Sequence, residues 1–157
     1  RRNLFCKCSR KLHKIMMYVS GIPSSRITDI WDKCKEYIEL GNNKSKQEMN
    51  IEDIYKKLLV AEMQLWIVFD EDANIKSVLT TEVVIYPRMK TCRIVTLGGK
   101  DMDIWVEQFL DILEEWAIDN DCVAMETACR KGFIKKLKEF GYEHTYTILT
   151  KELQTLH

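Results

Sequence analysis

The hydrophobic pattern is clearest in residues 91–120, where a strand, two glycines and a long helix follow one another. Residues 92–97 are mostly β-branched or apolar, which is typical of a strand, and Gly98 and Gly99 end it. Apolar residues then recur at spacings of three and four, as on one face of an α-helix, and Asp101 is a suitable N-cap. A strand that enters a helix through glycines directs free backbone N–H groups at one point, where proteins often hold a phosphate.

The same alternation and spacing rules predict the other elements. In chain order we expect strands at 15–19, 65–69, 75–86, 91–97, 122–128 and 142–153, and helices that begin after Ser25, Asn50 and Asp101 and at Gly132. Short turns make the three middle strands an antiparallel meander, whereas the long helix before the next strand predicts a parallel crossover. This order predicts an α+β domain with one mixed sheet.

The formal net charge of zero hides an uneven distribution. Residues 1–14, which we treat as a basic N-terminal tail, hold six of the 24 Lys and Arg and no acid, so residues 15–157 carry about −6. The body is therefore a poor candidate for nucleic-acid binding through bulk charge. The tail is predicted to be a solvated extension, and the alternative is that it contacts an acidic partner.

Cysteine spacing argues against a metal-binding protein, and hydropathy argues against a membrane-spanning one. Six scattered cysteines without a Cys-x-x-Cys pair predict no metal site, and buried reduced thiols in a reducing cytoplasm are the simpler interpretation, for Cys92 in particular. No apolar run approaches the length of a membrane span, so we expect no membrane helix.

The order of elements and certain residues resemble the GNAT superfamily, the acetyl-CoA-dependent N-acetyltransferases. The carriers are the meander, the Gly98–Gly99 turn into the long helix, the strand at 122–128 and the Leu-Lys-Glu-Phe-Gly-Tyr ending at 137–142. Over residues 15–157 the resemblance implies a single GNAT-like domain with a mixed central sheet of six to seven strands flanked by about four helices.

Within that superfamily the chain looks like the small GNAT-like proteins of tailed bacteriophages, and it resembles an assembly-related internal protein of short-tailed phages. The phrases that carry this likeness are Met63-Gln64-Leu65-Trp66-Ile67, Tyr86-Pro87-Arg88, Leu97-Gly98-Gly99, Glu114-Glu115-Trp116-Ala117 and Arg130-Lys131-Gly132. The likeness implies other phage virion or assembly proteins as partners, and the host bacterial cytoplasm or the virion as location.

The resemblance also implies a site for acetyl-CoA. The residues that it assigns to the coenzyme here are Leu97, Gly98, Gly99 and Lys100, the last three of them at the diphosphate. Arg130 and Lys131 would lie near the phosphates or the adenosine of the coenzyme, and the alternative for this pair is a solvated basic surface.

Three departures from the superfamily's pattern weigh against that site. Val95 stands where active members carry Arg or Gln, and Leu137 stands where they carry a tyrosine that protonates the coenzyme thiolate. Asp101 and Asp103 put negative charge where the diphosphate would sit.

Proton transfer from an amine calls for a carboxylate, a histidine or a tyrosine in the cleft. We assign it to Glu82 or Tyr146, with Glu126 and His144 as further candidates. The alternatives are charges on a solvated sheet face for the two glutamates, and ordinary edge-strand residues for His144 and Tyr146.

Two functions of different classes follow from these observations. The first is a bacteriophage virion- or assembly-associated scaffold with the GNAT fold and a degenerate acetyl-CoA site. The second is an acetyl-CoA-dependent N-acetyltransferase that acts on an amine. Binding of acetyl-CoA separates the two, because a ligand of the folded state must raise its stability.

Overall fold

The computed structural model describes residues 16–43 and 48–154, and the chain divides into two compact units, residues 1–127 and 128–157. The tail expected at 1–14 lies outside the described residues. The first unit contains the whole sheet.

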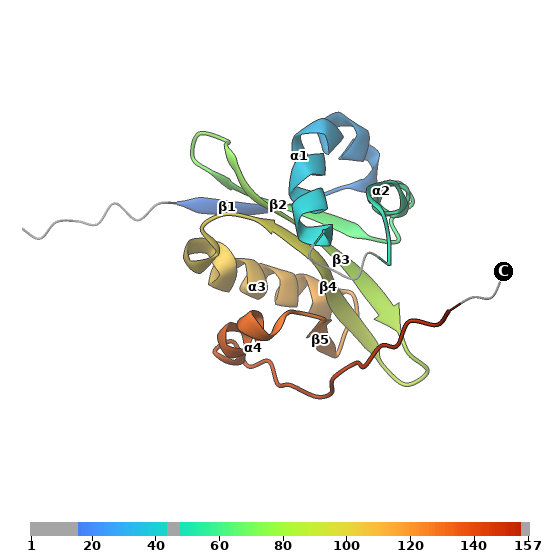
Figure 1. Cartoon of the computed structure of the whole chain (residues 1–157). Helices are drawn as coiled ribbons and strands as arrows, with labels where there is room; N and C mark the ends of the chain where they lie inside the picture. Colours follow the sequence, from blue (N-terminus) through green and yellow to red (C-terminus); the bar gives the residue numbers. More distant parts are fainter. Residues whose placement is uncertain (1–15, 44–47, 155–157) are drawn as a thin grey trace, which may run out of the picture. The chain divides into compact units, whose positions relative to one another are not determined.

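Five strands form the sheet of the described part, in the order β1–β2–β3–β4–β5 (Figure 1). Their bounds are Met17–Ile22 for β1, Gln64–Asp70 for β2, Ile75–Ile85 for β3, Lys90–Gly99 for β4 and Ala124–Thr127 for β5. β1 to β4 pair antiparallel and β5 pairs parallel to β4. The predicted meander and the predicted parallel crossover are therefore confirmed.

The prediction of six to seven strands was wrong, because the expected last strand does not form. Residues 142–153 have no regular secondary structure, and Tyr146, Ile148 and Leu149 are 70%, 65% and 91% exposed. An alternating sequence becomes a strand only where a neighbouring strand pairs with its backbone groups, and the alternation itself does not supply that neighbour. Tyr146 consequently lies in an irregular, exposed segment.

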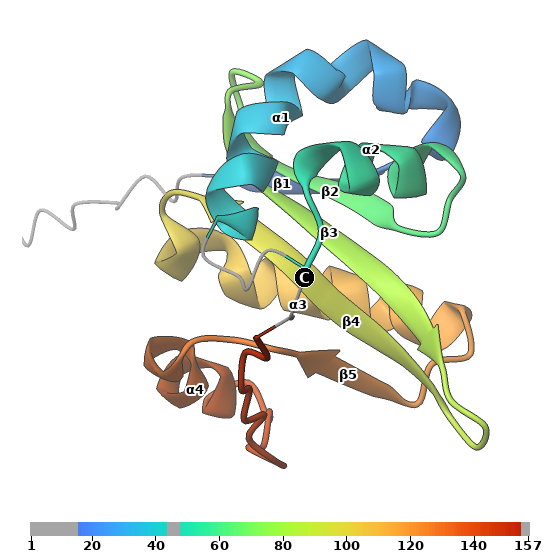
Figure 2. The ribbon, with the colours of Figure 1, turned by 45° about the vertical axis from the view of Figure 1, so that its right-hand side comes forward.

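Helices cover both faces of the sheet in the first unit (Figures 1 and 2). The helices are η1 (Ser24–Arg26), α1 (Ile27–Asn42) and α2 (Ile51–Leu59) on one face, and α3 (Met102–Asp119) on the other. Successive side chains of β2 point to opposite faces of the sheet, and this alternation separates the core under α1 and α2 from the core under α3. Leu65 and Ile67 pack with α1 and α2, whereas the Trp66 ring lies 6.3 Å from Phe109 and 5.5 Å from Trp116 of α3.

The helix starts agree with the sequence in one case and differ in another. α2 begins with the expected capping box, in which the Asn50 side chain accepts from the Asp53 amide and the Asp53 side chain accepts from the Asn50 amide, both at 2.9 Å. Asp101 does precede α3, but it has a left-handed backbone with φ 58° and its side chain makes no capping hydrogen bond. The start of α3 is therefore set by backbone geometry.

The second unit contains one helix in its described part, α4 (Lys131–Lys138), close to the range expected from Gly132. Among the helices of the described ranges, none is long and apolar enough to cross a membrane.

Candidate functional site: the fork between β4 and β5

β4 and β5 run together for a short distance and then separate. They pair from Thr91 with Ala124 to Ile94 with Thr127, where the Thr127 hydroxyl donates to the Ile94 carbonyl at 3.1 Å. β4 continues to Gly99 with β3 as its only strand partner in the described part of the chain. We call the point beyond the Ile94–Thr127 pair the fork. Past it, one edge of β4 is available to a ligand.

A β-bulge lies immediately after the fork. Thr80 pairs with Thr96 and Thr81 pairs with Ile94, which leaves Val95 as the extra residue of β4. The Val95 side chain packs against the core beneath α1 and α2. Because a bulge changes the direction of a strand, this one bends β4 where it leaves β5.

The peptide groups along the rest of β4 alternate between the two edges. The Lys100 amide donates to the Lys76 carbonyl of β3 at 2.9 Å. In an antiparallel ladder every second residue faces the same neighbour, so Gly98 also faces β3, and the peptide groups of Leu97 and Gly99 face the open edge. Of the residues expected to hold a coenzyme, Leu97 and Gly99 thus have backbone groups at this edge.

The two glycines of the turn have packing reasons of their own. A Cβ on Gly98 would lie 2.0 Å from the Tyr37 carbonyl oxygen of α1, so the glycine lets the helix approach the strand. A Cβ on Gly99 would lie 2.3 Å from the Lys76 carbonyl oxygen, and its φ of +150° is one that side-chain-bearing residues rarely adopt. A glycine pair at this turn is therefore required by the fold alone.

The start of α3 carries both attractive and repulsive groups for an anion. As at any helix N-terminus, its first amides lack the carbonyl acceptors that one preceding helical turn would supply, and the Ile104 amide donates instead to the Asp101 carbonyl at 2.9 Å. The Lys100 carbonyl accepts from the Trp105 indole nitrogen at 2.8 Å, which fixes the turn. Asp101 and Asp103 are both exposed, as is Lys100. The two carboxylates thus reduce the attraction of the helix N-terminus for a bound anion, and the Lys100 ammonium offsets this effect in part.

On the other side of the fork, three side chains from neighbouring strands and one from the residue just after β3 form one hydrogen-bonded group. We call Glu82 and Tyr86 with Arg93 and Glu126 the Arg93 network. Arg93 Nη1 donates to Glu82 Oε1 and its Nε donates to Glu126 Oε1, both at 3.1 Å. Its Nη2 donates to the Tyr86 hydroxyl at 3.3 Å and lies 2.9 Å from Glu126 Oε1 as an ion pair. The Tyr86 hydroxyl donates to Glu126 Oε1 and Oε2 at 3.0 and 3.2 Å. Arg93 and Glu126 are the strand pair next to Ile94–Thr127, the last pair before the fork.

The charges of this network hold two of its members in their protonated forms. The hydrogen bond to Glu126 is the main cause that raises the pKa of Tyr86 above its usual value, and burial adds to it. Burial acts to lower the pKa of Arg93, but the nearby carboxylates of Glu126 and Glu82 outweigh it and the pKa is raised. Tyr86 is therefore a hydrogen-bond donor at neutral pH, and Arg93 stays a cation.

The sequence pointed to Glu82 and, more weakly, to Glu126, but it missed the two residues that connect them. Arg93 lies between Cys92 and Ile94 and is the one charged residue between Lys90 and Lys100, and this isolated charge was the available signal. Burial of Cys92 raises the pKa of its thiol to about 12, so it stays a protonated thiol, as predicted.

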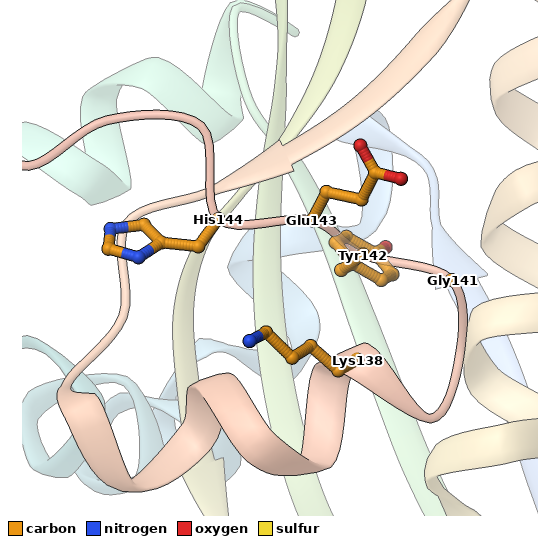
Figure 3. Close-up of a pocket in the computed structure, with 5 residues that line it drawn as sticks. All are labelled: Lys138, Gly141, Tyr142, Glu143 and His144. Atoms are coloured by element: carbon orange, nitrogen blue, oxygen red, sulfur yellow. The ribbon is translucent and has the colours of Figure 1, made fainter.

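The remaining predicted residues belong to the second unit. Arg130 and Lys131 stand at the start of α4, and both are exposed. His144 contributes to a pocket of about 430 Å³ with Lys138, Gly141, Tyr142 and Glu143 (Figure 3). The His144 ring also makes a 3.1 Å hydrogen bond with the Thr147 hydroxyl.

Comparison with protein-family models finds no match, and comparison with curated proteins finds none either. Solved structures do match over most of the chain. A predicted acetyltransferase with acetyl-CoA from Clostridium acetobutylicum is 14% identical with a TM-score of 0.63, over 87% of this chain and 96% of that chain. An aminoglycoside N-acetyltransferase in complex with CoA is 10% identical with a TM-score of 0.63, over 90% and 97%.

A third structure of the same kind is glucosamine-6-phosphate N-acetyltransferase from Arabidopsis thaliana, which is 8% identical with a TM-score of 0.62, over 88% of this chain and 99% of that chain. At these identities the likeness shows the fold alone. The chain therefore has the α+β fold of the GNAT acetyltransferases, here with a mixed sheet of five strands in the described part.

Proposed function

We propose that the protein is an acetyl-CoA-dependent N-acetyltransferase that acts on an amine. The observation that carries the proposal is the fork, where β4 leaves β5 and presents one unpaired edge that leads directly to the start of α3. An extended ligand that carries amides can pair with such an edge as an added strand would. The pantetheine arm of acetyl-CoA is a ligand of that kind.

The residues at the fork fit this coenzyme in part. Leu97 and Gly99 offer backbone donors and acceptors along the arm, and the first amides of α3 with Lys100 offer donors to a diphosphate. When bound, acetyl-CoA supplies an acetyl thioester. Asp101 and Asp103 lower the affinity: an exposed helix N-terminus favours an anion by up to about 1 kcal/mol, and one carboxylate about 4 Å away in water opposes it by about the same amount.

The test is a titration of the full chain with acetyl-CoA, followed by an assay for free CoA thiol with a panel of amines. We expect saturable binding at one site, a rise in the melting temperature, and thiol release that depends on the amine. A folded protein that shows neither binding heat nor a melting shift at millimolar acetyl-CoA would overturn the proposal.

A second function is favoured by the two carboxylates at the start of α3 and by Leu137, which stands where a tyrosine acid was expected. In this alternative the protein is a virion- or assembly-associated bacteriophage scaffold that no longer uses the coenzyme. Its partners would be other phage virion or assembly proteins. Finding the chain at fixed stoichiometry in purified particles, together with no acetyl-CoA binding, would select it over the enzyme.

A further inference from the structure

The two oxygens of Glu126 differ in what they already bind. Oε1 accepts from Arg93 Nε and lies 2.9 Å from Arg93 Nη2, whereas Oε2 has only a share of the single Tyr86 hydroxyl proton, at 3.2 Å, among the described residues. An ionised carboxylate oxygen can accept about two hydrogen bonds, so Oε2 keeps capacity for another donor. The Glu126 side chain is 27% exposed, so a ligand can reach it.

The network also fixes the orientation of Glu126. Tyr86, just after β3, and Arg93 on β4 hold the carboxylate on β5 from two directions, which removes rotamer freedom before any ligand arrives. Its place next to the Ile94–Thr127 pair puts it one residue from the fork. The whole network carries two carboxylates and one guanidinium, so one negative charge is left over for a cation.

We propose that Glu126 binds, at the fork, a cationic ammonium group of the acceptor other than the amine that reacts. Arg93 and Tyr86 are then positioning residues that orient its Oε2. This deepens the acetyltransferase proposal and rests on it for the identity of the acceptor. It assigns acceptors that carry at least one cationic ammonium besides the reacting amine, such as a diamine. Among the described residues Glu82 pairs with Arg93, and it lies one strand further from β5, so in this proposal it supports the guanidinium.

The first experiment needs no turnover. The full chain, labelled with ¹⁵N, is titrated with 1,4-diaminobutane and, as a neutral control, with 1,4-butanediol. We expect the Thr127 amide and the Arg93 Nε signals to shift with the diamine alone, and Glu126→Gln to weaken that binding about tenfold, as loss of one charge-assisted hydrogen bond does. Equal shifts with the diol, or unchanged binding by the variant, would overturn the proposal.

The second experiment separates positioning from a structural role. Glu126→Gln and Tyr86→Phe should raise the KM for a diamine acceptor about tenfold and about threefold, with the Kd for acetyl-CoA unchanged. Glu115→Gln, which changes an exposed carboxylate of α3 outside the network, is the charge-matched control and should leave the KM within about twofold. If all three variants change KM equally, or if the Kd for acetyl-CoA changes with it, the network is a strand clamp and the proposal is wrong.

The two proposals can fail separately. Diamine binding that depends on Glu126, without any binding of acetyl-CoA, would retain the cation site and remove the acetyltransferase. Binding of acetyl-CoA with turnover that ignores Glu126→Gln would do the reverse.

Discussion

The charged side chains on the two sides of the fork differ in exposure and in pairing. At the start of α3, Asp101, Asp103 and Lys100 are exposed, and no ion pair of Asp101 or Lys100 with another described residue forms. In the Arg93 network, each of the four polar side chains has a partner at 3.3 Å or less. The first region was visible in the sequence as a turn with glycines, and the second was not visible as a unit. A turn signature can thus be recognised from adjacent residues, whereas a side-chain network that joins three strands cannot.

The largest expected effect comes from the packing that underlies the first region. Gly98→Ala should lower the free energy of unfolding by about 3 kcal/mol or more, because the new methyl group meets the Tyr37 backbone and neither can rotate away. Urea unfolding measures it. Gly132→Ala is the control, since a Cβ there meets nothing within 4 Å. An equal, small effect of both changes would contradict the close approach of α1 to β4.

The next effect concerns the second region. Arg93→Leu should destabilise the protein by about 1–2 kcal/mol, because it removes the cation that lies between Glu82 and Glu126. The loss is no larger because the Arg93 side chain is 37% exposed and solvent screens its charge. Arg26→Leu removes the Arg26–Asp29 pair, whose side chains are 69% and 62% exposed, and should cost less than about 0.5 kcal/mol. Equal losses in urea unfolding would mean that the network is no more than a surface pair.

A smaller effect tests the acids at the start of α3. The double change of Asp101→Asn and Asp103→Asn should tighten acetyl-CoA binding about fivefold, as expected when nearby like charge is removed from an anion site. Calorimetric titration measures it at low salt. Asp111→Asn on the same helix is the control, because it lies about two turns further on. Unchanged affinity in the double variant would place the diphosphate elsewhere.

The smallest effect is a pH dependence. The pKa of Tyr86 is raised in the folded state, mainly by its hydrogen bond to Glu126. The stability that this bond contributes is fully present below the unfolded tyrosine pKa of about 10 and is lost as pH rises through the higher folded value. Wild-type protein should therefore lose stability more steeply than Tyr86→Phe as the pH rises above about 10. Parallel curves in urea unfolding would show that the bond is not formed.

The sequence predicted the elements well and the network poorly, for physical reasons. Local spacing is enough to place α3 after the glycines and α2 at its capping box, because those signals act within a few residues. The Arg93 network joins positions 82, 86, 93 and 126, which only strand pairing brings together. The prediction of a last strand at 142–153 was wrong for a related reason, since a strand depends on a neighbour that periodicity does not specify.

The central claim is that the open edge of β4 receives acetyl-CoA, and amide hydrogen exchange of the full chain with and without the coenzyme tests it most directly. We predict that exchange slows at Leu97 and Gly99, whose amides face the open edge, and does not change at Gly98, which faces β3. No slowing at Leu97 and Gly99 under saturating acetyl-CoA, or slowing that is equal across all three residues, would contradict the account.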